Sequence, residues 1–314
     1  MGPIPPEIGV LTSMTSYISF FNSITGPIPT SIGLIAPLQT FDVESNAMDG
    51  ELFKPEYAGP DGLKEIINFR ASLNNFIGSI PTEIGQWSKL QNLWFADNEV
   101  TGTLPSEIGN CVEMGAFLFY SNKIGGTLPT EIGNMNNMTW FDMENNQVVG
   151  TIPEELYGNS ELEQIILKSN SFSGSVSDKV GDLEKLTTFW ASFNQLSGTI
   201  PTTLGNCFNM KELELQNNAL SGPIPSELGN IKTIEFISVE QNELTGPIPG
   251  ALFDFSLMNL RILYLNDNKL TGQIPENYGS LPRVKDLWLS NNLLSGTLPI
   301  IAEGEFLLLR KYSI

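Results

Sequence analysis

The chain repeats one short pattern of apolar and polar positions along almost its whole length. Residues 90–105, LQNLWFADNEVTGTLP, show it most plainly: apolar and polar residues alternate up to Asn98, and further apolar residues flank Gly102 before Pro105. Equivalent Asn residues recur at a step of 24 residues nine times out of eleven, the other steps being 28 and 26. These marker residues are Asn22, Asn46, Asn74, Asn98, Asn122, Asn146, Asn170, Asn194, Asn218, Asn242, Asn268 and Asn292. Such a period predicts a solenoid of stacked coils.

Each repeat contains a short strand whose side chains alternate between the interior and the surface. Five residues before every marker Asn the side chain is apolar or aromatic, and three residues before it the side chain is apolar except at Ser19. This period of two is typical of a half-buried strand. Apolar residues two and six positions after the marker predict a second short extended segment that also faces the core.

The residues between these segments have the chemistry of turns. The marker Asn carries both donors and acceptors on its side-chain amide, so a stack of them can satisfy backbone groups of its own coil and of the neighbouring coil. Gly follows four residues later in every repeat, as at Gly102, which suits a positive φ or a close backbone approach. The Pro that ends the second segment cannot donate to a ladder and is missing only at Phe53 and Ser177.

These columns together resemble a known family. The run LxxLxLxxNxLxGxIPxxIG, read at residues 210–229 as MKELELQNNALSGPIPSELG, is similar to the plant-type leucine-rich repeat, and the resemblance covers essentially all of the chain. It implies an α/β repeat fold: a right-handed curved solenoid with a parallel sheet on its concave side and short 3₁₀ or helical segments on its convex side. We expect one solenoid over residues 1–314, in which each coil contacts only its neighbours.

The two ends and one insertion depart from the pattern. The chain opens on GPIPPEIG, half-way through a repeat, and closes with the start of a thirteenth strand at residues 309–314. We therefore expect a fragment of a longer protein, with twelve repeats, partial repeats at both ends and no caps. After Gly50 the expected Ile-Pro becomes Leu52-Phe53, and the net insertion of four residues predicts a loop on the convex or edge side.

The charge narrows the range of partners. The chain has 16 Lys and Arg against 35 Asp and Glu, a net charge of −19, which counts against nucleic acid and against direct contact with an anionic membrane surface. A basic partner is favoured instead. Some acids recur at the start of the convex segment, where a carboxylate near a first helical turn is favourable, and we interpret them as structural: Glu83, Glu107, Glu131, Glu154 and Glu227.

The sequence offers no metal or cofactor site. Cys111 and Cys207 stand in nearly identical contexts four coils apart, so we expect two buried free thiols that cannot form a disulfide. The chain contains no His, the commonest metal ligand and general base. Paired acids such as Asp142 and Glu144 are expected on an open face without a pocket to shift their pKa values, so the sequence favours binding over catalysis.

The concave face is the predicted binding surface. Its strands present aromatic residues among carboxylates, a mixture that suits a basic or hydroxyl-rich ligand. Trp recurs there in every fourth coil, and so does Glu at Glu44, Glu144 and Glu240, which we interpret as duplication of a four-repeat block. The candidate ligand-binding residues are Trp94, Tyr120, Trp140, Asp142, Glu144, Trp190, Glu212, Glu214, Glu240, Tyr264 and Trp288.

Three functions stay open at this stage. The resemblance implies an extracellular or cell-surface location, and it favours a receptor-like ectodomain that binds a protein or peptide. It is also compatible with an inhibitor of a hydrolase that degrades cell walls. The third possibility is ice binding through a ladder of hydroxyls beside the repeat Gly, such as Thr101, Thr103, Ser197, Thr199, Ser295 and Thr297. A single glycosylation sequon begins at Asn137.

Overall fold

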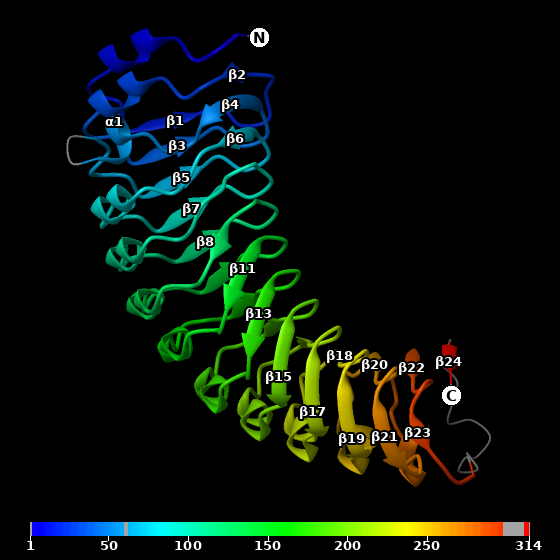
Figure 1. Cartoon of the computed structure of the whole chain (residues 1–314). Coiled ribbons are helices and arrows are strands. Elements are labelled where there is room, and N and C mark those ends of the chain that lie inside the picture. Colours follow the sequence, from blue (N-terminus) through cyan, green and yellow to red (C-terminus); the bar gives the residue numbers. More distant parts are fainter. Residues whose placement is uncertain (1, 60–61, 298–310, 314) are drawn as a thin grey trace. The chain divides into compact units, whose positions relative to one another are not determined.

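The structure is a computed structural model that describes residues 2–59, 62–297 and 311–313. Contacts divide the chain into two compact units, Met1–Leu162 and Glu163–Ile314, here called the N-terminal and C-terminal units. Each is a stack of coils of the predicted kind (Figure 1). One uninterrupted solenoid over residues 1–314 stays a prediction, and so do the repeat boundaries within residues 298–310, which lie outside the described residues.

The predicted strands form a parallel sheet in each unit, with neighbouring strands one coil apart and in register. In the N-terminal unit these strands are β1 (Ser16–Ile18), β3 (Thr40–Asp42), β5 (Asn68–Arg70), β7 (Asn92–Trp94), β8 (Ala116–Leu118) and β10 (Trp140–Asp142). In the C-terminal unit they are β12 (Gln164–Ile166), β14 (Thr188–Trp190), β16 (Glu212–Glu214), β18 (Phe236–Ser238), β20 (Ile262–Tyr264), β22 (Asp286–Trp288) and β24 (Lys311–Ser313). The central residue of each of these strands from β3 to β22 is buried in the core, as Leu93 and Leu213 are.

A second layer of parallel strands, divided between separate sheets, lies on the other side of the Asn turn, and the sequence did not predict that its segments pair. Its strands in the N-terminal unit are β2 (Thr25–Gly26), β4 (Ala47–Glu51), β6 (Asn75–Ile77), β9 (Gly125–Gly126) and β11 (Gln147–Gly150). Those in the C-terminal unit are β13 (Ser171–Gly174), β15 (Gln195–Thr199), β17 (Ala219–Pro223), β19 (Glu243–Pro247), β21 (Lys269–Gly272) and β23 (Leu293–Leu294). The repeat Gly ends or bends each segment at a positive φ, for example +75° at Gly222.

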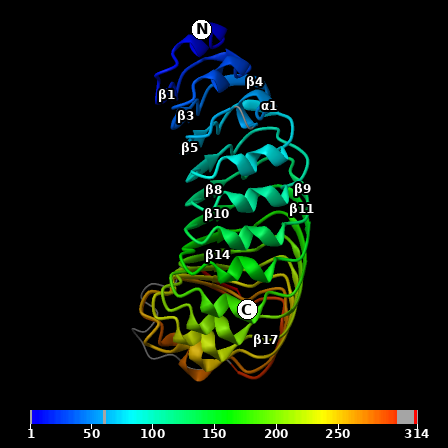
Figure 2. The same cartoon turned by 90° about the vertical axis from the view of Figure 1, so that its left-hand side faces the viewer.

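Short 3₁₀ helices complete most coils and stack on one another (Figure 2). They are η1 (Pro6–Val10), η2 (Thr30–Leu34), η3 (Thr82–Gln86), η4 (Ser106–Asn110), η5 (Thr130–Asn134), η6 (Glu154–Gly158), η7 (Asp178–Asp182), η8 (Thr202–Asn206), η9 (Ser226–Asn230), η10 (Gly250–Phe253) and η11 (Glu276–Gly279). The stacking is so close that a Cβ on Gly109 would lie 2.4 Å from the carbonyl oxygen of Glu131 in the next coil. At this position of the 3₁₀ helix, Gly is therefore required by the close contact between coils rather than by its backbone angles.

The predicted Asn ladder is confirmed within both units. Asn122 accepts a hydrogen bond from the backbone N–H of Val100 (2.9 Å) and donates to the carbonyl of Phe95 (3.0 Å), both in the preceding coil. Its Nδ2 also lies within hydrogen-bond distance of the carbonyl of Phe119 in its own turn. The residue before each marker adopts a left-handed conformation, with φ of 52° at Asp97 and 54° at Phe193. The marker amide thus holds together a turn that non-glycine residues adopt at a cost.

The insertion after Gly50 is more than a surface loop, which corrects the sequence-based expectation. It forms the short helix α1 (Pro55–Ala58), whose Tyr57 is fully buried. Phe53, which replaces the usual Pro, packs into the core with its ring centroid 5.7 Å from that of Phe69 and 5.5 Å from that of Phe95. The insertion therefore supplies aromatic core residues to the N-terminal unit.

Both cysteines are buried and free, as predicted. Each thiol lies within hydrogen-bond distance of a carbonyl in the preceding coil, Cys111 with Ile84 (3.4 Å) and Cys207 with Val180 (3.3 Å). Burial raises the pKa of either thiol to about 12. These thiols are structural, because a nucleophilic or metal-binding cysteine needs an accessible thiolate.

Candidate functional site

The outward side of the β1-to-β10 sheet and that of the β12-to-β24 sheet are here called the N-terminal and C-terminal strand faces. Each carries three rows of side chains, at six, four and two residues before the marker Asn. On the C-terminal strand face the first row is Gln164, Thr188, Glu212, Phe236, Ile262 and Asp286. The second row is Ile166, Trp190, Glu214, Ser238, Tyr264 and Trp288. The third row is Lys168, Ser192, Gln216, Glu240, Asn266 and Ser290.

The eleven predicted binding residues fall on these two faces. Five lie on the N-terminal strand face, namely Trp94, Tyr120, Trp140, Asp142 and Glu144, and six on the C-terminal strand face, namely Trp190, Glu212, Glu214, Glu240, Tyr264 and Trp288. Ten of them are half-buried and Asp142 is buried. Register explains the shielding, because each side chain stands about 4.8 Å from its equivalent in the next coil. Their role in binding stays a prediction.

On the N-terminal strand face a cation of the chain itself occupies one aromatic site. The guanidinium of Arg70 lies 4.1 Å from the ring centroid of Trp94 and 3.7 Å from the carboxylate of Asp42. These three residues are neighbours in one row of consecutive coils. The Trp94 ring is therefore already engaged by a cation–π contact.

Asp142 is the most strongly perturbed acid of the N-terminal strand face. It is 6% exposed, and one of its oxygens accepts a hydrogen bond from the backbone N–H of Glu144 (3.1 Å). Burial raises its pKa to about 7, to which the charges of Glu144 and Asp97 contribute, so the expectation of an unshifted pKa on an open face is wrong for Asp142. Tyr120 lies near these acids, and burial together with the charges of Asp97 and Asp142 raises its pKa.

On the C-terminal strand face a network of polar side chains holds Glu214. Its carboxylate accepts hydrogen bonds from Gln216 (3.1 Å) and Ser192 (3.3 Å), and Lys168 lies 3.9 Å away. The Lys168 ammonium is also 5.8 Å from the ring centroid of Trp190, which stands beside Glu214 in the second row. The chain thus again places one of its own cations beside a Trp and a carboxylate.

Three aromatic residues form a continuous surface on the same face. The Tyr264 and Trp288 rings stack with centroids 4.3 Å apart, and Phe236 meets Tyr264 edge-on at 5.9 Å. Phe236 also borders an open depression of about 240 Å³, which is lined by Glu212, Glu214, Glu235, Phe236, Arg261 and Ile262. Burial raises the pKa of Glu212, and the charge of Glu214 adds to the effect.

Sequence reasoning missed the residues that surround these acids and rings. Arg70, Lys168 and Arg261 bring positive charge to faces that the composition suggested were acidic. Arg70 stands one coil away from Trp94, and Arg261 stands one coil away from Glu235. Lys168 stands one coil away from Trp190 and two coils away from Glu214. Reading the second row from coil to coil would have placed Arg70 next to Trp94, whereas Lys168 and Arg261 lie outside that row.

The hydroxyl ladder beside the repeat Gly runs along the second layer of strands, and three of its hydroxyls bond to the backbone. Thr101 donates to the carbonyl of Gly78 (3.0 Å), Ser197 to that of Gly174 (3.5 Å) and Ser295 to that of Gly272 (3.4 Å). These hydroxyl donors are used in hydrogen bonds that join neighbouring coils.

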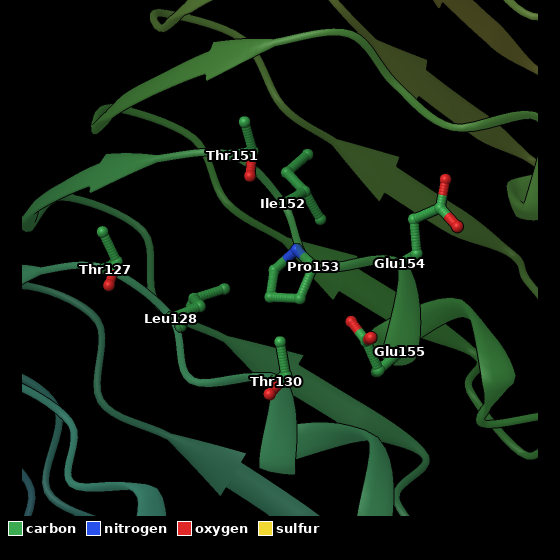
Figure 3. Close-up of a pocket in the computed structure, with 8 residues that line it drawn as sticks. All are labelled: Thr127, Leu128, Thr130, Thr151, Ile152, Pro153, Glu154 and Glu155. Carbon is green, nitrogen blue, oxygen red and sulfur yellow. The ribbon is translucent and has the colours of Figure 1, made fainter.

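An open depression of about 560 Å³ lies in the N-terminal unit. It is lined by Thr127, Leu128, Thr130, Thr151, Ile152, Pro153, Glu154 and Glu155 (Figure 3). Its open shape and polar lining lack the apolar enclosure of a small-molecule site.

Asn137, the sequon residue, is exposed at the start of its coil, and its glycosylation stays a prediction. Among the described residues no group of three or more His, Cys, Asp or Glu side chains could hold a metal ion. No helix in residues 2–59, 62–297 or 311–313 is long and apolar enough to cross a membrane.

Comparisons with known proteins agree with this architecture. The leucine-rich repeat family model matches residues 89–111, 185–207, 209–231 and 259–281. The plant peptide hormone receptor RGFR1, in complex with RGF2, is 36% identical with a TM-score of 0.90 over 95% of this chain and 47% of that one. The Arabidopsis receptor kinase HAESA, in complex with the peptide hormone IDA and the co-receptor SERK1, is 31% identical with a TM-score of 0.86 over 93% of this chain and 48% of that one.

A plant ice-binding protein shares the fold at 23% identity and a TM-score of 0.62, over 80% of this chain and 81% of that one. A search of curated proteins finds no match. The chain spans about half the length of the two receptors. The repeat pattern, the parallel sheets with 3₁₀ turns and these similarities show that the chain belongs to the plant-type leucine-rich repeat proteins and is similar to plant receptors that contain them.

Proposed function

We propose that this chain is a non-catalytic recognition module of a cell-surface receptor that binds a basic peptide or protein segment on its C-terminal strand face. The observation that carries the proposal is the aromatic surface of Tyr264 and Trp288 beside the carboxylates of Glu212, Glu214 and Glu240. Aromatic side chains dominate binding hot spots because they bury much area at low entropic cost.

The shape and charge of the face support an extended ligand. Four coils of the sheet extend over roughly 19 Å, which accommodates about six residues of extended chain. The net charge of −19 attracts a basic segment and accelerates its association. The similar structures of RGFR1 and HAESA contain peptide hormones, which favours a peptide over the other ligands considered.

The experiment is a selection of peptides from a random display library on the purified protein, followed by affinity measurements. We expect enrichment of basic peptides, and Trp190→Ala should weaken their binding by 2 kcal/mol or more, as expected of a central aromatic hot spot. Association should slow as salt rises, because exposed charges are screened beyond ~8 Å at physiological ionic strength.

Trp94→Ala is the matched control on the N-terminal strand face and should leave the affinity of these peptides unchanged. Loss of binding in Trp94→Ala but not in Trp190→Ala would move the site to the other face. Inhibition of ice growth that is lost on substitution of Thr101 and Thr199 would replace the proposal with ice binding. Tight binding of a polysaccharide hydrolase, with no peptide selected, would favour the inhibitor.

A further inference from the structure

The third row of the C-terminal strand face presents three acceptor side chains on consecutive coils: Gln216, Glu240 and Asn266. Backbone hydrogen bonds fix their order, since the N–H of Asn217 donates to the carbonyl of Glu240 and that of Gln241 to the carbonyl of Asn266, both at 3.1 Å. Glu240 is half-buried, whereas Gln216 is 8% and Asn266 is 7% exposed. A ligand that reaches this row therefore meets Glu240 first.

Both amide side chains have a buried carbonyl oxygen without a hydrogen-bond partner among the described residues. Their NH₂ groups are used, because Gln216 donates to Glu214 (3.1 Å) and Asn266 donates to Asp267. Turning either amide over would press its oxygen against a carboxylate oxygen, so the hydrogen-bond network fixes the assignment. The row therefore holds two unsatisfied acceptors, and buried acceptors of this kind are rare in folded proteins.

The charge around the row is also uncompensated. The Glu240 carboxylate accepts a hydrogen bond from Ser238 and forms no ion pair with any residue that the structure describes. Burial raises its pKa, and the neighbouring charges of Glu214 and Asp267 add to the effect. Basic side chains nearby have other partners: Lys168 lies at Glu214, and Arg261 lies at Glu235.

We propose that Gln216, Glu240 and Asn266 form a subsite for an arginine side chain of the partner, an inference that rests on the proposed function. The guanidinium pairs with the Glu240 carboxylate and donates its outer N–H groups to the two amide oxygens, while both amides keep their NH₂ contacts. This arrangement gives each orphaned acceptor a donor and neutralises the carboxylate. Charge-assisted hydrogen bonds of this type are among the strongest that a side chain makes.

The spacing of the row favours arginine over lysine. Acceptors on neighbouring coils are about 4.8 Å apart, so the outer two residues of the row stand two such steps apart. An ammonium is a compact point charge whose N–H···O bonds of about 2.9 Å reach acceptors on adjacent coils only. A guanidinium carries five donors in a planar fork and spans the greater width.

Two small probes test the subsite on the whole chain, N-acetyl-L-arginine amide and N-acetyl-L-lysine amide. NMR signals of the side-chain amides of Gln216 and Asn266 report on the row directly. We expect saturable shifts with the arginine probe, at an affinity at least roughly fivefold higher than that of the lysine probe, the worth of about one further hydrogen bond. Equal shifts with both probes, or none with either, overturn the proposal.

Substitutions separate binding from structure. Gln216→Met removes an unsatisfied acceptor and keeps the volume, so we expect an unchanged or slightly higher melting temperature and an arginine-probe affinity roughly fivefold lower. The matched control Gln195→Met, on the exposed side of β15, should change neither. A lower melting temperature with unchanged probe affinity would assign Gln216 a structural role and overturn the subsite.

Glu240→Gln provides a second, nearly isosteric variant, and it should abolish the arginine-specific shifts. Shifts that persist in this variant contradict the subsite.

The arginine subsite and the proposed function can be refuted independently of each other. Peptides that bind with dependence on Trp190, while the arginine probe shifts neither amide, overturn the subsite alone. Arginine-probe binding with no peptide selected overturns the proposed function.

Discussion

The side-chain amide of Asn146 donates a hydrogen bond of 3.0 Å to the backbone carbonyl of Phe119 in the preceding coil. Its oxygen accepts from the N–H of Ile124, also at 3.0 Å and also in that coil. One side chain thus satisfies two backbone groups that face the turn. The repeat of this relationship along each unit explains why the marker position admits Asn and excludes the isosteric Leu.

Asn146→Leu should therefore lower the free energy of unfolding by ~1–3 kcal/mol, the cost of leaving buried backbone groups unpaired. Chemical denaturation of both proteins measures the difference. The control is Asn137→Gln, because Asn137 is exposed and makes only a long contact with Glu113 (3.4 Å). If both substitutions cost the same, the ladder contributes nothing specific.

Contact between 3₁₀ turns predicts a sharp difference between two glycines of the N-terminal unit. A Cβ on Gly109 would lie 2.4 Å from the Glu131 carbonyl oxygen, whereas one on Gly158 would meet nothing within 4 Å. Gly109→Ala should thus lower stability by roughly 1–3 kcal/mol, as overpacking does. Gly158→Ala should be neutral or raise stability by up to about 1 kcal/mol through the unfolded chain. Thermal unfolding that ranks the two variants in the opposite order would contradict the stacking.

The two thiols should react slowly with a thiol reagent in the native protein. Both are fully buried, and their pKa of about 12 leaves almost no thiolate at neutral pH. Labelling should become fast only in denaturant, which mass spectrometry can follow. Rapid labelling of both cysteines without denaturant would show that the assigned coil register is wrong.

Asp142 should make stability depend on pH. Its folded-state pKa of about 7 lies above the value of about 3.9 in an unfolded chain, so the native state binds more protons between these values. The stabilisation that the protonated Asp142 carboxyl gives to the native state is fully present below about pH 4 and is lost as the pH rises to about 7. This stabilisation amounts to a few kcal/mol at most. Asp142→Asn should flatten the dependence of the unfolding midpoint on pH in this range. An unchanged slope would show that the carboxyl is better solvated than the structure indicates.

Periodicity was enough to predict the fold from the sequence. The apolar columns, the marker Asn and the repeat Gly each report a contact that recurs in every coil, so one misread residue changes little. Phe53 and Tyr57 were missed because they occur once, where the insertion replaces a turn by a helix that packs into the core. The left-handed residue before each marker was also missed, because positions such as Asp97 and Phe193 share a conformation and no side-chain type.

The candidate site was harder to predict, since its chemistry depends on pairs of residues in different coils. The sequence indicated which aromatic and acidic residues share a strand face, and the structure places them there. It could not indicate that Arg70 covers Trp94 or that Lys168 reaches Trp190, because long side chains can extend in several directions from one strand position. The net charge of the chain was misleading for a related reason, because a single cation within an acidic surface changes the total charge little.

The last prediction concerns Lys168, because its ammonium competes with any basic ligand for Trp190 and Glu214. Its ammonium lies 5.8 Å from the ring centroid and 3.9 Å from the carboxylate, the two groups to which a ligand cation would bind. Lys168→Met keeps much of the side-chain length and removes the charge. The affinity of a selected basic peptide should rise roughly twofold to fivefold, mostly through faster association, because a partly exposed ion pair of this kind contributes up to about 1 kcal/mol.

The control for the change in net charge is Lys123→Met in the N-terminal unit. Lys123 pairs with Glu99 at 3.1 Å on an exposed surface, so its loss makes the chain equally more acidic without altering the C-terminal strand face. We expect at most a small gain in affinity from this variant at low salt and none at physiological salt, where distant charges are screened. Surface plasmon resonance at two salt concentrations separates the two effects. If Lys168→Met instead weakens peptide binding, Lys168 orients Trp190 for the ligand rather than occupying its place.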